Sequence, residues 1–160
     1  MFELPEPYET TRQELLERDR AAFKSWNPPA TERDICRNKC TWWAKTFQER
    51  HPELTLVRGF FGIRNPENPC TEVAIIEHVW FTTELGEIID PTRAQFGSLQ
   101  EGWSDLYRVF DPEQDHILIG KCPNCGEEIY GLEKDGPKDI CSEECAESYT
   151  RYITREAARL

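Results

Sequence analysis

The chain lacks any long apolar run, and it has few basic residues for its many acidic ones. No stretch approaches the roughly 18 apolar residues of a membrane-spanning helix, and residues 1–20 alternate acids, prolines and arginines instead of resembling a signal peptide. With 19 Lys and Arg against 30 Asp and Glu, the net charge is −11, and the average field repels phosphate. We therefore expect a cytoplasmic protein without a membrane or nucleic-acid partner.

Internal repeats and low-complexity segments are also missing, which excludes solenoid and disordered-tail architectures. A length of 160 residues suits one compact domain with a small appendage. The sequence predicts a core over residues 1–120 and an appendage over residues 121–160. It leaves the oligomeric state open.

The appendage is predicted from four of the seven cysteines, Cys122, Cys125, Cys141 and Cys145. Two thiolate pairs at this spacing fill the tetrahedral shell of Zn²⁺ and leave no position for water, which is typical of a structural site. The segment from Cys141 to Cys145 also resembles the second half of treble-clef zinc fingers, in which the last ligand lies in the first turn of a helix. We expect one Zn²⁺ per chain and a C-terminal helix capped by Ser142.

The predicted zinc finger has two interpretations. Metal binding contributes folding free energy to a small unit with few apolar residues, so structural support is the first. The second is a recognition module for a partner protein. Residues 121–160 hold six Lys and Arg against nine Asp and Glu, which argues against nucleic acid.

A nucleophile is predicted from the helical spacing of Cys40, Trp43, Ala44 and Phe47, which fall at i, i+3, i+4 and i+7. We expect a chain break at residues 37–39, so that Cys40 lies in the first turn of a helix. There the positive end of the helix dipole favours the thiolate.

A base is predicted from residues 72–81, which are rich in β-branched and aromatic types and read as a strand. If a hairpin is centred on Glu84, His78 lies opposite Asp90. Opposed side chains are about 4.5 to 5.5 Å apart at Cβ, close enough for the carboxylate to accept the imidazole N–H and fix its tautomer.

Each of these residues taken alone has a plainer explanation. Cys40 suits a buried core cysteine, His78 a packed strand residue, and Asp90 a turn residue before proline. A rival metal site from Cys36, Cys40, Cys70 and His78 has usable spacing at its first pair but leaves Asp90 unexplained. Cys36 is also a candidate resolving thiol.

Several short motifs together resemble the transglutaminase-like superfamily of papain-like thiol enzymes. The chain resembles its nucleophile helix at Cys40-Thr41-x-x-Ala44-x-x-Phe47, its V-x-G-type strand at Val57-Arg58-Gly59-Phe60, its H-x-W at His78-Val79-Trp80 and its D-P-T at Asp90-Pro91-Thr92. Asn38 stands where the family usually has glycine. The resemblance implies an α+β fold, catalytic Cys40, His78 and Asp90, and acyl transfer through a thioester.

We therefore expect N-terminal helices packed on an antiparallel sheet in a papain-like, transglutaminase-like core, followed by the zinc finger. The expected function is a thiol-dependent amide hydrolase, meaning a deamidase, amidase or peptidase, acting on a protein, peptide or small amide through an acyl-enzyme on Cys40. The oxyanion candidates are the Cys40 backbone N–H and the Asn38 side chain. Two alternatives stay open: an acyltransferase (transglutaminase) with an amine acceptor, and a non-catalytic zinc-containing scaffold for protein interaction.

Overall fold

The computed structural model describes residues 3–68, 72–97 and 101–157, and for residues 72–74 and 152–157 only the backbone. The chain divides into two compact units, Met1–Val109 and Phe110–Leu160. This boundary lies before the predicted one at residues 120 and 121, because the strand His116–Lys121 pairs with a strand of the second unit.

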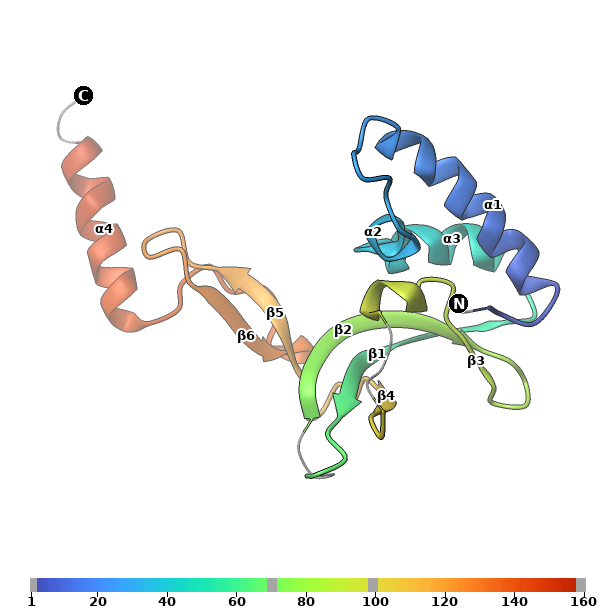
Figure 1. Cartoon of the computed structure of the whole chain (residues 1–160). Helices are drawn as coiled ribbons and strands as arrows, with labels where there is room; N and C mark the ends of the chain where they lie inside the picture. The colour runs from blue at the N-terminus through green and yellow to red at the C-terminus, as the bar shows by residue number, and fades with distance from the viewer. Residues whose placement is uncertain (1–2, 69–71, 98–100, 158–160) are drawn as a thin grey trace. The chain divides into compact units, whose positions relative to one another are not determined.

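The first unit combines helices with an antiparallel sheet, which confirms the predicted α+β class. Its sheet has the strand order β3-β2-β1-β4, and every pairing is antiparallel. Figure 1 shows α1, α2 and α3 together over one face of the curved sheet. The elements in chain order are α1 (Tyr8–Arg20), η1 (Ala21–Phe23), α2 (Glu32–Cys36), α3 (Cys40–Arg50), β1 (Thr55–Arg64), β2 (Glu72–Thr82), β3 (Ile88–Ile89), η2 (Arg93–Phe96) and β4 (Ser104–Val109).

The helices are fixed by local signals and by one shared core. At the start of α2, Thr31 and Asp34 form a reciprocal capping box. Leu16 of α1 and Phe47 of α3 are fully buried, and the Phe47 ring stacks on Phe81 of β2 at 5.8 Å between centroids. Because burial of each such side chain contributes about 1.5 to 3 kcal/mol, this cluster holds the helices on the sheet.

A glycine allows close packing in the centre of the sheet. Gly59 of β1 lies opposite His78 of β2 and next to Val109 of β4. A Cβ atom at Gly59 would overlap the Trp80 ring and the Arg108 carbonyl. The small residue therefore lets Trp80 lie across the strand beside His78.

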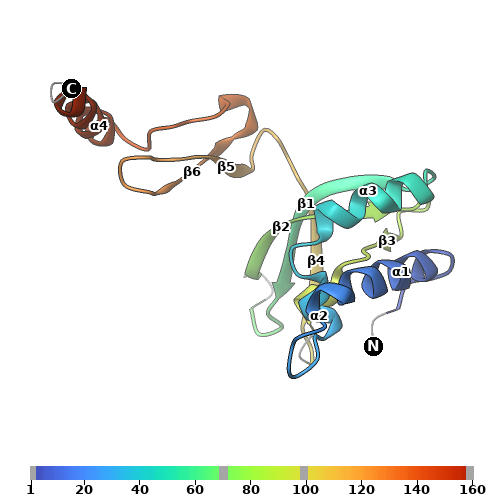
Figure 2. The same ribbon diagram turned by 90° about the horizontal axis from the view of Figure 1, so that it is seen from above.

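The second unit contains a β-hairpin followed by a helix. Figure 2 shows β5 and β6 side by side, and their pairing runs antiparallel from His116 with Leu132 to Lys121 with Glu128. Ser142 caps the last helix as predicted, because the Cys145 N–H donates to its hydroxyl oxygen at 3.2 Å. The elements are β5 (His116–Lys121), β6 (Glu128–Leu132), η3 (Glu133–Asp135) and α4 (Glu143–Ala157).

Among the described residues, no helix combines the length and the apolar character that a membrane crossing requires.

Candidate active site and metal centre

Cys40 is the first residue of α3, and the chain breaks just before it as predicted. Helix α2 ends at Cys36, and Asn38 in the connection has a φ of +59°. Amide groups in the first turn of a helix have no intrahelical partner, and they give this end a partial positive charge. The Cys40 sulfur therefore lies where a thiolate is stabilised.

The left-handed backbone at Asn38 directs the chain from α2 into α3. Glycine reaches this conformation freely, and asparagine is among the side-chain-bearing residues that tolerate it best. The Asn38 N–H donates to Oε1 of Gln95 at 3.3 Å, which ties the connection to η2. Because the recorded contact comes from the backbone and the side chain is exposed, the oxyanion role of Asn38 stays a prediction.

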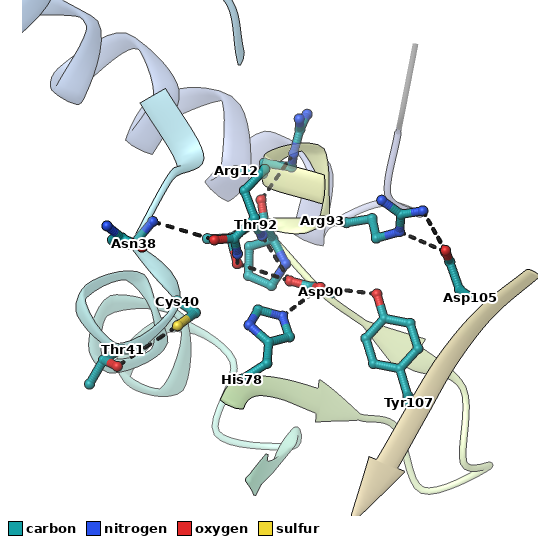
Figure 3. Close-up of polar contacts among 12 residues, drawn as sticks. Arg12, Asn38, Cys40, Thr41, His78, Asp90, Thr92, Arg93, Asp105 and Tyr107 are labelled. Carbon is teal, nitrogen blue, oxygen red and sulfur yellow. Dashed lines mark hydrogen bonds and ion pairs between the residues drawn. The ribbon is translucent and has the colours of Figure 1, made fainter. Parts of the chain in front are cut away.

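His78 and Asp90 meet as a buried pair. Nε2 of His78 lies 2.8 Å from Oδ2 of Asp90, and both residues are almost fully buried. In Figure 3 the Cys40 sulfur lies on the side of the imidazole opposite Asp90. The structure thus brings the three predicted residues together in the order Cys40, His78, Asp90.

The register predicted for the hairpin is wrong, although the pair it was meant to form exists. Phe81 pairs with Ile89, so the hairpin is centred on Leu85 rather than Glu84, and His78 is not directly opposite Asp90. The Thr83 N–H donates to the Glu87 carbonyl at 3.0 Å and closes the turn around Leu85. Because the opposed residues shift by two positions, each side chain keeps its predicted face of the sheet.

Asp90 is held by neighbours on both of its oxygens. Oδ1 accepts hydrogen bonds from the Thr92 N–H at 3.0 Å and the Thr92 hydroxyl at 3.1 Å, and Oδ2 accepts one from the Tyr107 hydroxyl at 3.0 Å. Burial and the adjacent Asp90 charge raise the pKa of Tyr107, so it stays a donor. Sequence reasoning missed Tyr107, since no local motif links β4 to the Asp-Pro-Thr turn.

A second missed residue is Arg12 of α1, whose side chain is fully buried. Its Nε donates to the Pro91 carbonyl at 3.2 Å. Its terminal nitrogens pair with Glu9 at 2.9 Å and Glu32 at 2.7 Å. Arg12 therefore joins α1 and α2 to the turn that carries Asp90, and its charge is balanced within the protein.

Aromatic rings enclose the imidazole of His78. The Phe96 ring meets it edge-on at 5.0 Å between centroids, Trp80 lies at 6.1 Å, and Phe61 lies at 6.3 Å. These rings limit access of water to the His78–Asp90 hydrogen bond, which strengthens it electrostatically.

The environment favours charged forms of both Cys40 and His78. Burial alone lowers the pKa of His78, but hydrogen bonds to Asp90 and Cys40 and the charges of both outweigh it and raise this pKa to about 9. Burial alone raises the pKa of Cys40, but the hydrogen bond to His78 and its positive charge outweigh it and lower this pKa. The two groups thus favour transfer of the thiol proton from Cys40 to His78, which gives a thiolate and an imidazolium.

Cys36 and Cys70 have no established part in the site. Cys36 is fully buried, and burial raises its pKa to about 12, so its thiol does not readily ionise. Cys70 lies outside the described residues, and the rival metal site that includes it stays a prediction. In the described part of the chain, the cysteine cluster of the second unit is the group that fits a metal ion.

Two grooves border Cys40. One has a volume of about 360 Å³ and an apolar character, and it includes Thr41, Ala44, Leu56 and Val79 in its lining. The other, of about 450 Å³, includes Asn38, Gln95 and Phe96. Thr41 Oγ1 of the first groove lies 3.9 Å from the Cys40 sulfur, and Phe96 of the second contacts the His78 ring, so each groove is lined by a residue that touches the site.

The candidate metal centre belongs to the second unit and brings together all four predicted cysteines. The sulfurs of Cys122, Cys125, Cys141 and Cys145 all lie within 4.8 Å of one another. Zn–S bonds of about 2.3 Å in a tetrahedron separate sulfurs by about 3.8 Å, so the four thiols fit one such ion. At the first pair, the Gly126 N–H donates to the Cys122 carbonyl at 2.8 Å and closes the knuckle.

Comparisons of the chain with models of known protein families, with curated proteins and with solved structures find no match.

Proposed function

We propose that the first unit is a transglutaminase-like, papain-like thiol enzyme that hydrolyses an amide. The observation that carries the proposal is the position of His78, between the buried Asp90 carboxylate at 2.8 Å and the Cys40 thiol at a helix N-terminus. Deamidases, amidases and peptidases all hydrolyse an amide bond. The substrate class is accordingly a protein, a peptide or a small amide.

The first half-reaction forms a thioester on Cys40. The thiolate attacks the amide carbonyl carbon, and the electron pair of the C=O bond moves to oxygen. When that pair returns, the C–N bond breaks and the amine leaves with the proton that His78 donates. Asp90 accepts the other imidazole N–H throughout, which keeps the ring oriented and stabilises its positive charge.

The second half-reaction releases the acid. Neutral His78 takes a proton from water, the hydroxide oxygen bonds to the thioester carbon, and the C–S bond breaks to return the Cys40 thiolate. The Cys40 backbone N–H is the main candidate for stabilising the oxyanion, because it belongs to the open first turn of α3. The Asn38 side chain is the second candidate.

The backbone at Asn38 supports the family resemblance. This position has a φ of +59°, a region in which glycine is favoured. Asparagine can therefore replace the usual glycine without changing the course of the chain into the nucleophile helix. Nothing in the unit calls for a second substrate, so water is the preferred acceptor and an amine is the alternative.

For the second unit we propose one structural Zn²⁺ held by Cys122, Cys125, Cys141 and Cys145. All four positions of a tetrahedral ion are then thiolates, which leaves no site for a reacting water. A reducing compartment such as the cytoplasm keeps these thiols and Cys40 unoxidised, and we include that location in the proposal.

Trapping an acyl adduct tests the enzymatic proposal. The parent protein and Cys40→Ser are incubated with cell extract, quenched in acid and compared by intact mass. The parent should gain a mass that maps to Cys40 and is removed by hydroxylamine, as a thioester is. If the parent gains no such mass and its Cys40 is alkylated no faster than an ordinary thiol, the protein is a scaffold.

A further inference from the structure

The strand β2 has an open edge that begins at the proposed active site. The Thr83 N–H donates to the Glu87 carbonyl at 3.0 Å, so the odd-numbered residues of β2 direct their backbone groups toward the β3 side. The register with β1 is regular from Thr82 to Ile75, so this alternation continues along the strand.

Strand β3 covers only the beginning of that edge, where it pairs with Phe81 and Thr82. At the next odd position, the Val79 N–H points to the Cys40 sulfur and contributes to lowering its pKa. The backbone groups of Glu77 and Ile75 follow on the same side, and no described strand pairs with them there. The edge therefore continues past the thiol as a template for another extended chain.

The groove of about 450 Å³ adjoins this edge. Ile76 of β2 contributes to its lining, as does Phe96, which contacts the His78 ring. Arg33 and Arg37 come from α2 and the residue that follows it, and both are exposed. The lining of the groove thus includes a residue of β2, a ring that contacts His78 and two arginines.

The charge of this groove opposes that of the whole chain, which is −11. Among the described residues, no carboxylate forms an ion pair with Arg33 or Arg37. Among the described lining residues, the carboxylate belongs to Asp34, which accepts hydrogen bonds from the Thr31 N–H at 2.9 Å and hydroxyl at 2.7 Å. Two cations therefore face the groove while the lining anion is held in a helix cap.

We propose that the substrate is an extended peptide segment that adds as a strand to the edge of β2 at Glu77 and Ile75 and places an acidic side chain against Arg33 and Arg37. This inference rests on the proposed amide chemistry at Cys40. Backbone pairing supplies affinity without sequence preference, and the arginines supply the preference. Residues two apart in a strand share a face and lie about 6.6 Å apart, and we place the acidic residue two positions from the target residue.

Peptide probes of Cys40 test the preference. Hexapeptides carry a chloroacetyl group on one side chain and differ only in Glu or Gln two positions away. The Glu peptide should alkylate Cys40 about fivefold faster at low concentration, the size expected for one partly exposed charge pair. Arg33→Gln and Arg37→Gln should each reduce the ratio of the Glu rate to the Gln rate. Arg37→Glu should reverse the preference, so that a third peptide with Lys at this position reacts faster than the Glu peptide.

The matched control is Lys24→Gln, which removes one positive charge from an exposed position on the same unit. Its ratio should equal that of the parent. A Glu peptide with N-methyl groups on alternate backbone nitrogens should lose its advantage, because it cannot pair with the strand edge. Circular dichroism checks that each variant is folded.

Iodoacetamide separates the two levels of the proposal. If it alkylates Cys40 rapidly while Glu and Gln peptides react equally, the thiol chemistry stands and the acidic specificity is wrong. If Lys24→Gln lowers the ratio as much as the arginine variants, the preference comes from the overall field and the groove is not its source. Slow alkylation by every reagent contradicts the enzymatic proposal itself.

Discussion

The two units use cysteine in opposite ways. In the first, one thiol lies beside an imidazole that a large packed core positions. In the second, four thiols gather within 4.8 Å of one another, and the buried hydrophobic side chains among its described residues are Cys122 and Ile129. In our proposal, the first unit uses its fold to control a thiol, whereas the second uses four thiols to bind a metal ion that stabilises its fold.

The difference shows that the surroundings of a cysteine decide its chemistry. Cys36 and Cys40 are four residues apart, yet burial raises the pKa of Cys36 to about 12 while the His78 pair lowers that of Cys40. If this comparison is correct, each change should affect one unit. Metal removal should act on the second unit, whereas substitution of His78 or Asp90 and changes of pH should act on the thiol of the first.

Metal removal should have the largest effect and should be confined to the second unit. Binding of structural zinc contributes about 10 to 16 kcal/mol in small fingers, so a chelator or Cys141→Ser should unfold the unit around α4. Native mass spectrometry should find one zinc ion in the parent and none in the variant. Hydrogen exchange should show that amide protection is lost after Phe110 and unchanged before it. If native mass spectrometry found two zinc ions in the parent, the assignment of Cys40 as a free thiol would be wrong.

Substitutions of the His78 pair should have the next largest effect and should leave zinc content unchanged. In a serine hydrolase, the corresponding Asp→Asn change lowers turnover by about four orders of magnitude through the wrong tautomer. His78→Ala should return Cys40 to a thiol with a pKa of about 8.5 and slow its alkylation at pH 6 at least about tenfold. Asp90→Asn should slow it less, and the double variant should resemble His78→Ala because the residues act as a unit.

The pH dependence follows from the same pair. His78 has a raised pKa of about 9, so the stability that its charged form contributes is complete below the ordinary histidine pKa of 6.5 and is lost as the pH rises through about 9. The lowered pKa of Cys40 acts in the opposite sense, and its contribution is lost as the pH falls through that value. Alkylation measured from pH 4 to 10 should therefore be fast well below pH 8.5, and amide turnover should fall above about 9. An ordinary thiol titration in the parent and all variants would exclude the pair.

Arg12→Met should destabilise the first unit by about 3 kcal/mol, because it leaves the buried Pro91 carbonyl without this donor and removes the cation beside the half-buried Glu9 and Glu32 carboxylates. Urea unfolding followed by tryptophan fluorescence measures this change. The same substitution at exposed Arg20 in α1 is the control and should stay within about 0.5 kcal/mol. Equal effects of the two substitutions would show that Arg12 does not hold the Asp90 turn.

The smallest effect is expected at Asn38, where two substitutions separate backbone from side chain. Asn38→Gly suits the φ of +59° and should preserve stability, whereas Asn38→Ala should cost about 1 kcal/mol. If the Cys40 N–H is the main oxyanion donor, Asn38→Gly should also keep the acylation rate. A large loss of rate with full stability would assign the oxyanion role to the Asn38 side chain.

Local patterns in the sequence predicted several features correctly because each depends on neighbours in the chain. The break before Cys40 and the cap at Ser142 are both set within a few residues. The spacing of the four zinc-site cysteines is also local at each pair. The α+β class was expected from the family resemblance of several short motifs.

Tertiary structure decided what depends on distant partners. The hairpin register shifted because the turn from Thr83 to Glu87 selects its own hydrogen bonds, and periodicity alone does not fix turn length. Tyr107 and Arg12 reach Asp90 and Pro91 from elements far away in the chain, so no spacing could reveal them. The sequence determined which residue types carry the chemistry, whereas packing of α1, α3 and β4 decided which atoms meet, because long-range contacts are made only when apolar faces are buried together.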